Sequence, residues 1–290
     1  GIVGPGTLEM LNANRFSWIE RIDANLERWR WLPRAQPHTY LRVNIPAFNL
    51  QMVKDDQTES SMDVIVGRIY RRTPVFSADL RYMVVNPFWN VPFTLAVQDK
   101  LPLLRKDAGA AAAQGFEVQR GDQTTFVAVD TVDWSEVTRG NFNYLLRQRP
   151  GANNALGQIK FMLPNPHAVY LHDTPTRELF AKQERSFSSG CVRLSDHLRL
   201  ANWLLAQDGQ ANQAAQVEAL IASGETRTLH LKRPVPVLLV YFTAFTDASG
   251  AVVFRRDLYQ RDAPIVAALR RGAEPADAGP AGATLAQLRY

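Results

Sequence analysis

The stretch "RSFSSGCVRLSD", Arg185–Asp196, contains Cys191, the only cysteine among 290 residues. A lone cysteine cannot form an internal disulfide or a cysteine-based metal site, so Cys191 is either a small buried hydrophobe or a reactive thiol. A nucleophilic thiol needs a base, an oxyanion hole and access to substrate. Gly190 permits close backbone approach, so the amides of Gly190 and Cys191 are candidate oxyanion donors, and Arg193 is a candidate partner for a carboxylate.

His172, in "YLHDTP", is the candidate base. It ends an alternating stretch, "HAVYLHD", that predicts a strand, and it precedes Cys191 by 191 − 172 = 19 residues. This separation allows a strand and a neighbouring loop to bring the two side chains together. His167 is a weaker candidate, because five residues away on the same predicted strand its side chain points to the opposite face. Three other histidines have no supporting context and are expected to be surface or structural residues: His38, His197 and His230.

The segment alone leaves two interpretations of Cys191 open. Ser188 and Ser189 precede it, but no G-x-S-x-G turn surrounds them, so we expect turn or hydrogen-bonding roles for these serines. A thiol poised for catalysis is expected to be alkylated quickly below neutral pH, whereas a buried structural cysteine resists alkylation until the protein unfolds.

The composition is that of an ordinary, weakly basic globular chain. Lysine and arginine number 33 and aspartate and glutamate 28, which gives a formal charge of +5. This excess permits an acidic partner, but the basic residues form no long run, which disfavours nucleic-acid binding. The sequence shows no apolar run long enough for a membrane span, no signal-peptide pattern at its first residues and no H-E-x-x-H metal motif.

The spacing of apolar residues predicts an α+β fold with a mainly β core. Residues 38–93 read as strands, residues 95–157 have a looser texture typical of an insertion or lid, and strands resume at "IKFML". A helix is expected over "DHLRLANWLLAQ", capped by Ser195 or Asp196, and a late strand pair around "DASG".

A first helix is predicted from about Ser17 to Trp31, with Ser17 and Glu20 at the spacing of a capping box. Four apolar residues fall on one face of this helix, and we expect them to pack in the core: Trp18, Ile22, Leu26 and Trp29.

The segment from His167 to Asp196 resembles the catalytic segment of the L,D-transpeptidases with the YkuD-type catalytic domain. That family pairs a histidine on a strand with a downstream Ser-His-Gly-Cys motif followed by an arginine. Here the motif reads "SSGC" over residues 188–191, with His172 and Arg193 in the other two positions. Ser189 departs from the usual histidine, so the role of that histidine is not carried over. The "SSGC" form is similar to the large periplasmic branch of Gram-negative bacteria.

The resemblance covers nearly the whole chain, since "LERWRWLPR", "VNPFWNVP" and "VVFRRDLYQRD" also look like that branch. It implies a YkuD-like mixed β-sandwich with an inserted capping subdomain and flanking helices. The implied parts are a remnant of a peptidoglycan-binding module in 1–14, a helical linker in 15–37, a catalytic domain in 38–94 and 158–262, the capping subdomain in 95–157, and a mobile C-terminal tail in 263–290.

The resemblance implies a two-step acyl transfer between peptidoglycan tetrapeptide stems, which serve as donor and acceptor. The Cys191 thiolate attacks the carbonyl of diaminopimelate and releases D-Ala, and a second stem's diaminopimelate amine resolves the thioester to give a 3→3 cross-link. His172 takes the thiol proton, and no side-chain triad with Asp173 is expected, because adjacent side chains on a strand diverge. In the family a backbone carbonyl commonly orients the histidine. Four residues are expected to line the substrate site: Arg193, Tyr170, Ser189 and Trp89.

The same resemblance implies a periplasmic enzyme without cofactor or metal, acylated by carbapenem β-lactams, and it allows partners from the cell-wall synthesis machinery. Three alternatives stay open. Water as acceptor makes the enzyme an L,D-carboxypeptidase, a lipoprotein lysine makes it an anchoring transpeptidase, and a merely buried Cys191 makes it a non-catalytic peptidoglycan-binding protein.

Overall fold

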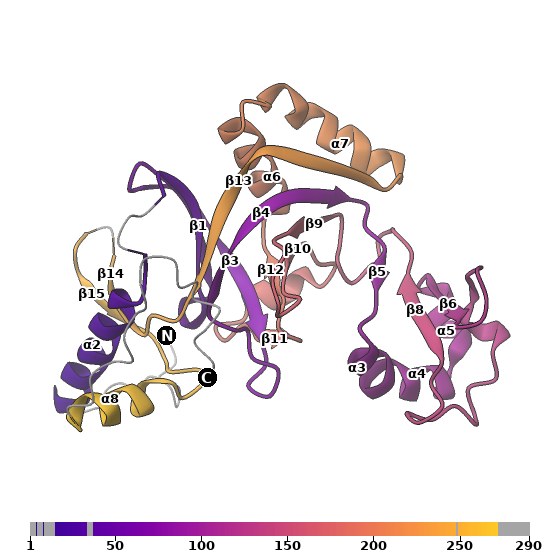
Figure 1. Ribbon diagram of the computed structural model, residues 1–290, viewed down its shortest axis with the longest axis horizontal. Coiled ribbons are helices and arrows are strands. Elements are labelled where there is room, and N and C mark those ends of the chain that lie inside the picture. Colours follow the sequence, from indigo (N-terminus) through magenta and orange to yellow (C-terminus); the bar gives the residue numbers. More distant parts are fainter. Residues whose placement is uncertain (1–3, 5–7, 9–14, 34–36, 248, 272–290) are drawn as a thin grey trace.

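The computed structural model describes residues 4, 8, 15–33, 37–247 and 249–271. A large sheet occupies the centre, with α6 and α7 along one side of it, a smaller sheet with three short helices at one end, and α2, α8 and a hairpin at the other (Figure 1). The strands are β1 Thr39–Asn44, β2 Asn49–Lys54, β3 Gln57–Gly67, β4 Phe76–Val85, β5 Trp89–Asn90, β6 Phe116–Arg120, β7 Val127–Ala128, β8 Tyr144–Gln148, β9 Ile159–Met162, β10 Leu171–His172, β11 Ser186–Ser188, β12 Val192–Leu194, β13 Arg227–Val240, β14 Ala244–Thr246 and β15 Val252–Phe254. The helices are α2 Arg15–Arg30, α3 Phe93–Leu95, the π-helical η2 Ala96–Lys100, α4 Leu101–Lys106, α5 Ala108–Ala113, α6 His197–Gln207, α7 Ala214–Ser223, α8 Asp262–Arg270, and the 3₁₀ segments η1 Ile45–Ala47, η3 Val129–Thr131, η4 Arg177–Ala181 and η5 Ala211–Gln213.

The large sheet has the strand order β11-β3-β12-β10-β9-β4-β13-β1-β2, and β2 pairs with β3 as well, so the sheet closes on itself. Three pairs are parallel, β1 with β13, β10 with β12 and β11 with β3, and the others are antiparallel. The mixed, sheet-rich α+β fold predicted from the sequence is confirmed. Closure leaves a continuous apolar interior that includes Leu41, Met83, Phe161 and Leu194, all with 0% exposure.

Helix α6 packs on this core through Leu200 and Leu204. It begins after Asp196, whose carboxylate accepts a hydrogen bond from the Arg199 amide at 3.0 Å, as the sequence predicted. This cap satisfies one of the amide donors that the first turn of a helix leaves without a partner. The helix therefore starts directly after the cysteine segment and fixes its downstream end.

The strand predicted over "HAVYLHD" is mostly wrong, because only Leu171 and His172 are paired as β10. Asn165 is the physical reason. Its side-chain oxygen accepts from the amides of His167 and Val169, and its amide group donates to the Val169 carbonyl at 2.7 Å, so the backbone turns instead of extending. His167 consequently lies in a turn against the ring of Phe76, with ring centroids 5.0 Å apart.

The smaller sheet has the order β5-β8-β6-β7 and its own apolar cluster, which includes Trp89, Val118 and Leu146. Since β5 begins at Trp89, this sheet starts before residue 95, where the sequence placed the insertion. Tyr170 packs against both this cluster and the main core. One residue of the predicted site thus lies where the two cores meet.

The hairpin predicted around "DASG" is present as β14 and β15, which pair antiparallel. The preceding "PVPVLLV" belongs instead to the long β13, which pairs with β1 and β4.

Residues 263–270 form most of α8, in contrast to the mobile tail expected from residue 263, because Ile265 is buried against the body of the protein. The predictions for residues 272–290 and for all of 1–14 except Gly4 and Leu8 fall outside the described residues.

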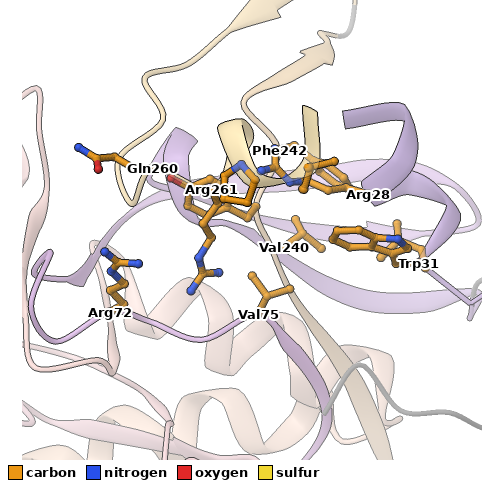
Figure 2. A pocket seen from close by; sticks show the side chains of 12 residues that line it. Arg28, Trp31, Arg72, Val75, Val240, Phe242, Gln260 and Arg261 are labelled. Carbon is orange, nitrogen blue, oxygen red and sulfur yellow. The ribbon is translucent and has the colours of Figure 1, made fainter. Parts of the chain in front are cut away.

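The apolar stripe predicted for α2 does not pack as expected. Leu26 is 58% exposed and Trp29 42% exposed, whereas the buried face carries Asn25, Glu27 and Arg28. Trp29 keeps one aromatic contact, a stacked arrangement on Phe242 with centroids 4.6 Å apart. Together with the end of β13 and with α8, this helix also lines a cavity (Figure 2).

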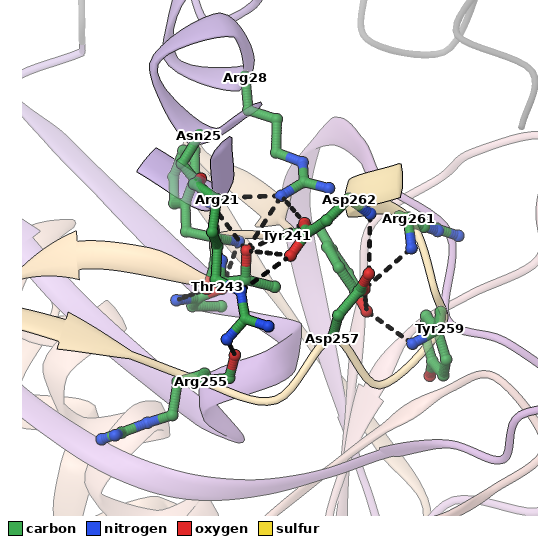
Figure 3. A network of polar contacts seen from close by, with 12 residues as sticks. Arg21, Asn25, Arg28, Tyr241, Thr243, Arg255, Asp257, Tyr259, Arg261 and Asp262 are labelled. Atoms are coloured by element: carbon green, nitrogen blue, oxygen red, sulfur yellow. Dashed lines mark hydrogen bonds and ion pairs between the residues drawn. The ribbon is translucent and has the colours of Figure 1, made fainter. Parts of the chain in front are cut away.

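A buried polar network explains why α2 turns its polar face inward (Figure 3). Arg28 Nη1 donates to Asp262 Oδ1 at 2.6 Å and lies 3.3 Å from Thr243 Oγ1. Asn25 Nδ2 donates to the same Thr243 oxygen at 2.8 Å, and its oxygen accepts from the Thr243 amide. Charged groups are buried at tolerable cost only when they are paired, so this face must meet α8 and Thr243 while the apolar stripe remains outside.

The ion pair between Arg28 and Asp262 is therefore expected to be a main anchor of α2. Asp262→Asn leaves the Arg28 charge buried without its partner and should lower the free energy of unfolding by about 3 kcal/mol in urea denaturation. The control is Glu225→Gln, which breaks the exposed pair with Arg227 and should cost less than about 1 kcal/mol. Equal losses in the two variants would show that the buried pair does not anchor the helix.

Candidate active site

The pairing of β10 with β12 brings the predicted base and thiol segments together. The two strands are neighbours and parallel, with His172 opposite Arg193. Cys191 immediately precedes this paired segment, and the Val192 amide donates to the Tyr170 carbonyl at 3.1 Å. The structure therefore joins, in one two-stranded segment, residues that the sequence separates by about twenty positions.

The cysteine loop is held from both sides by hydroxyl groups. Ser188 Oγ donates to the Cys191 carbonyl at 2.5 Å and accepts from the Gly190 amide at 3.1 Å, and Thr73 Oγ1 donates to the Gly190 carbonyl at 2.8 Å. Gly190 has a backbone φ angle of 117°, which residues other than glycine rarely adopt. Ser188 thus has the turn role expected of it.

The two candidate oxyanion donors, the amides of Gly190 and Cys191, differ in whether they already have a hydrogen-bond acceptor. The Gly190 amide is engaged by Ser188 Oγ, whereas the Cys191 amide has no hydrogen-bond acceptor among the residues that the structure describes. Only an amide without an internal acceptor is ready to stabilise developing negative charge. The Cys191 amide is therefore the better oxyanion candidate of the two.

His172 is buried and oriented by a backbone carbonyl. Its Nδ1 lies 2.5 Å from the carbonyl oxygen of Asp173, which makes Nδ1 the donor and leaves Nε2 unprotonated. Burial, followed by the positive charge of Arg193, lowers the pKa of His172 to about 3, so the ring is neutral near pH 7. The Asp173 carboxylate turns instead toward Arg177 at 2.7 Å and His197 at 3.0 Å, and so forms no side-chain triad with His172.

Cys191 is partly buried, and its burial raises the pKa of the thiol above the ordinary value. Hydrogen bonds from Tyr170 and the charges of Lys160 and Arg193 act in the opposite direction without cancelling the effect of burial. At rest both groups are therefore neutral: Cys191 is a thiol whose Sγ lies 3.9 Å from the Ala168 carbonyl oxygen, and His172 is a neutral imidazole. The expected fast alkylation below neutral pH does not follow from this structure, because the reactive thiolate is scarce there.

Lys160 is a site residue that the sequence analysis missed. It lies on β9 directly opposite His172, and its Nζ is 4.1 Å from the centre of the Tyr170 ring. Burial lowers the pKa of Lys160 below its usual value, and the interaction with Cys191 opposes this shift only in part. The signal was present in "IKFM", because Ile159 and Phe161 are fully buried and alternation places Lys160 on the other face of the sheet.

Arg193, across β10 from Lys160, has hydrogen-bonding capacity to spare. Its Nη1 donates to Thr176 Oγ1 at 3.3 Å, while its Nε is buried without a hydrogen-bond partner among the described residues. A buried guanidinium N–H without an acceptor is costly, and a carboxylate would satisfy it. The sheet thus presents a row of cation, neutral imidazole and cation from Lys160 through His172 to Arg193.

Tyr170 and Trp89 lie together at the junction of the two apolar clusters. The Tyr170 ring is 5.6 Å from that of His172, and its hydroxyl interacts with Cys191 and Trp89. Burial raises the pKa of Tyr170 well above its usual range, so the hydroxyl stays protonated. The structure therefore places Tyr170 against Cys191 and His172, with Trp89 next to Tyr170.

Ser189 is exposed and connects the cysteine loop to the smaller sheet's helical segments. Arg71 Nη1 donates to Ser189 Oγ at 3.0 Å and to Asp99 in η2 at 2.5 Å, while Nη2 donates to Gln98 at 3.0 Å. No motif in the sequence marks Arg71 as a functional residue. Its role depends on a contact 118 residues away, which no local pattern indicates.

Metal-binding clusters and membrane-spanning helices are both absent from the described residues. No group of three or more His, Cys, Asp or Glu side chains there is placed to hold a metal ion. No helix in that part of the chain has the length and apolar character needed to cross a membrane.

The low pKa of His172 predicts a specific pH dependence of stability. A histidine that is neutral in the folded state and has an ordinary pKa when unfolded stabilises the protein fully above pH about 6.5, and this contribution is lost as the pH falls toward about 3. His172→Gln should therefore flatten the loss of unfolding free energy over this window. His38→Gln, at an exposed site, should leave the pH dependence close to that of the parent. A parent-like slope in His172→Gln would contradict a buried, neutral His172.

Comparisons with solved structures find several L,D-transpeptidases at low similarity. L,D-transpeptidase 3 from Mycobacterium tuberculosis is 12% identical, with a TM-score of 0.33 over 70% of this chain and 61% of that one. The catalytic domain of the Enterococcus faecium L,D-transpeptidase acylated by ertapenem is 11% identical, with a TM-score of 0.26 over 71% of this chain and 99% of that one.

The sequence comparisons are more informative. A Haemophilus influenzae protein named "Putative L,D-transpeptidase" is 35% identical over 246 residues, which is 85% of this chain and 49% of that protein. The chain thus spans about half the length of this curated relative. The family model of the YkuD L,D-transpeptidase catalytic domain matches residues 38–237. The chain therefore belongs to the L,D-transpeptidase family with the YkuD catalytic domain.

Proposed function

We propose that this protein is a peptidoglycan L,D-transpeptidase that forms 3→3 cross-links through a thioester on Cys191. Membership of the family supports acyl transfer, and one observation in the structure carries the assignment of residues. The β10–β12 pairing brings the chain segment of Cys191 next to that of a neutral His172, whose Nδ1 is anchored on a backbone carbonyl. This combination supplies a nucleophile and a base in the protonation states that the reaction needs.

In the first step the sulphur of Cys191 attacks the diaminopimelate carbonyl of the donor stem while His172 Nε2 accepts the thiol proton. The Cys191 amide donates to the oxyanion that forms. Collapse of this intermediate keeps the C–S bond and breaks the C–N bond, and His172 returns the proton to the departing amine of D-Ala. Because both groups are neutral at rest, proton transfer accompanies the attack and does not precede it.

In the second step the side-chain amine of an acceptor stem's diaminopimelate attacks the thioester. His172 accepts a proton from this amine and delivers it to the departing sulphur, which restores the thiol. An amide bond is broken in the first step and another is made in the second, so the reaction needs no ATP. The chemistry balances with the stems alone.

The two cations beside His172 have separate tasks in this proposal. Arg193, with an unsatisfied buried Nε, binds a carboxylate of the stem peptide. Lys160 stabilises the negative charge that develops on Cys191, since the two groups interact electrostatically. Tyr170 and Trp89 form an aromatic wall, and Ser189 lies at the exposed edge of the site.

The identity of the acceptor separates this proposal from its closest alternatives. An L,D-carboxypeptidase or an anchoring transpeptidase would use the same thioester with water or a protein lysine. The partly buried setting of Cys191 beside Tyr170 favours an amine over water, because exclusion of water protects a thioester from hydrolysis. A periplasmic location agrees with a peptidoglycan substrate and is part of the proposal.

The direct test is mass spectrometry of muropeptides after incubation with purified disaccharide-tetrapeptide. The parent should produce dimers joined through two diaminopimelates, and Cys191→Ala should produce none, because the thioester cannot form. Ser186→Ala, near the cysteine but outside the turn, should retain activity. Tripeptide without dimers would identify a carboxypeptidase, and unchanged tetrapeptide would contradict an acyl-transfer function.

Carbapenems should acylate the same sulphur, because their strained amide carbonyl replaces that of the donor stem. Intact-mass measurement with a carbapenem such as meropenem should show one adduct on the parent and none on Cys191→Ala. An adduct that persists in the variant would refute Cys191 as the nucleophile.

Lys160 should affect the reactivity of Cys191 in a defined direction. Lys160→Met keeps most of the side-chain volume but removes the charge that lowers the thiol pKa, so the pH midpoint of iodoacetamide alkylation should move upward and alkylation at neutral pH should slow about tenfold. Lys182→Met removes an exposed charge and should change neither. An unchanged midpoint in Lys160→Met would exclude this role.

A further inference from the structure

A cavity lies between α2, the end of β13 and the start of α8, and its lining includes none of the residues of the cysteine site. Its volume is about 240 Å³, below the ~300–1,000 Å³ of most pockets for drug-sized ligands, so its occupant must be small. Most of the lining is apolar and includes Trp31, Val75, Val240 and Ile265. Figure 2 shows the Arg261 guanidinium extending into the space between Arg72 and Val75.

Three guanidiniums interrupt this apolar lining: Arg28, Arg72 and Arg261. Arg28 has a side chain only 5% exposed, and its Nη1 is neutralised by Asp262, yet its Nη2 has no hydrogen-bond partner among the described residues. Arg261 Nε is likewise buried without a partner in that part of the chain. Two buried N–H donors at one cavity are rare in folded proteins, because each unsatisfied donor destabilises the fold.

The charges at the cavity do not balance. Within the described residues, neither Arg72 nor Arg261 has a carboxylate at ion-pair distance. Arg261 lies instead beside the stacked rings of Tyr241 and Tyr259, at 5.1 and 5.3 Å from their centres, and Arg72 lies 5.7 Å from the Tyr259 ring. Aromatic rings position a guanidinium but accept none of its in-plane N–H bonds, so both groups retain donors for a ligand.

We propose that this cavity is a binding site for a small carboxylate with an apolar body. The planar guanidinium groups match a carboxylate head, which would satisfy the buried donors and the uncompensated charge. The apolar walls would take an attached hydrocarbon or aromatic group and disfavour a sugar or a multiply charged ligand. The proposal does not depend on acyl transfer, because it uses none of the residues assigned to the reaction.

The site is nevertheless connected to the cysteine loop by covalent and hydrogen-bonded neighbours. Arg72 precedes Thr73, whose hydroxyl holds the Gly190 carbonyl, and the Tyr259 hydroxyl accepts from the Thr73 amide at 3.2 Å and donates to the Gly67 carbonyl at 2.6 Å. The binding test should use Cys191→Ala. This variant has no thiol, so any signal comes from binding and not from a reaction at the sulphur.

Octanoate is a suitable probe, with octylammonium and 1-octanol as matched probes of opposite and zero charge. Isothermal titration calorimetry should detect octanoate at millimolar concentration and show at least about tenfold weaker binding of the other two. The indole ¹⁵N–H signal of Trp31, assigned through Trp31→Phe, should shift with octanoate and thereby place it in this cavity.

Variants then identify the groups responsible. Arg261→Met keeps the apolar volume and removes the charge, and should weaken octanoate binding at least about tenfold, whereas Arg227→Met, at an exposed and remote position, should not. No octanoate binding, equal binding of octanol, or unchanged affinity in Arg261→Met would each overturn the proposal. If Arg261→Met does not fold, the comparison of octanoate with octylammonium on the Cys191→Ala protein decides alone.

Discussion

The site depends above all on the parallel pairing of two very short strands, β10 and β12. This pairing sets His172 opposite Arg193 and leaves Cys191 at the point where the chain enters the sheet. Two residues of pairing would not hold two chain segments by themselves. They hold here because β9 and β3 flank the pair in a sheet that closes through β2, so a shift in register would move the core residues Leu171 and Val192 out of the interior.

The electrostatics of the site follow from where this pairing lies. The sheet buries His172 between two cations, Lys160 and Arg193, and both charges lower its pKa in addition to the effect of burial. The same two charges oppose the rise in the pKa of Cys191 that burial causes. A neutral thiol and a neutral imidazole are therefore the resting forms, and the surrounding cations become most favourable when negative charge appears on sulphur or oxygen. The Cys191 thiol is therefore only weakly nucleophilic at rest.

The sequence was sufficient for residues whose chemistry and local setting coincide. The spacing of His172, Cys191 and Arg193, the Asp196 cap and the mixed, sheet-rich fold could all be anticipated, because each depends on a local pattern or on a family motif. The pattern failed at "HAVYLHD", where the side chain of Asn165 competes with strand pairing for the backbone amides.

Other features depend on distant partners and could not be predicted. The buried face of α2 is polar because Arg28 meets Asp262 across 234 positions. The role of Lys160 follows from its register against β10, and that of Arg71 from contacts with Ser189 and Asp99. Helical periodicity ranks faces by hydrophobicity, so it selected the stripe of α2 on which Trp18 and Ile22 are half-buried and Leu26 and Trp29 are exposed.

The central claim is that the resting site holds a neutral His172, with its proton on Nδ1, beside a protonated Cys191. The most direct measurement is ¹⁵N NMR of the histidine rings near neutral pH, with the His172 signals assigned through His172→Gln. The structure predicts one protonated nitrogen, Nδ1, hydrogen-bonded to the Asp173 carbonyl, and an Nε2 without a proton. Protonation of both nitrogens at that pH would reveal an imidazolium–thiolate pair and contradict the account.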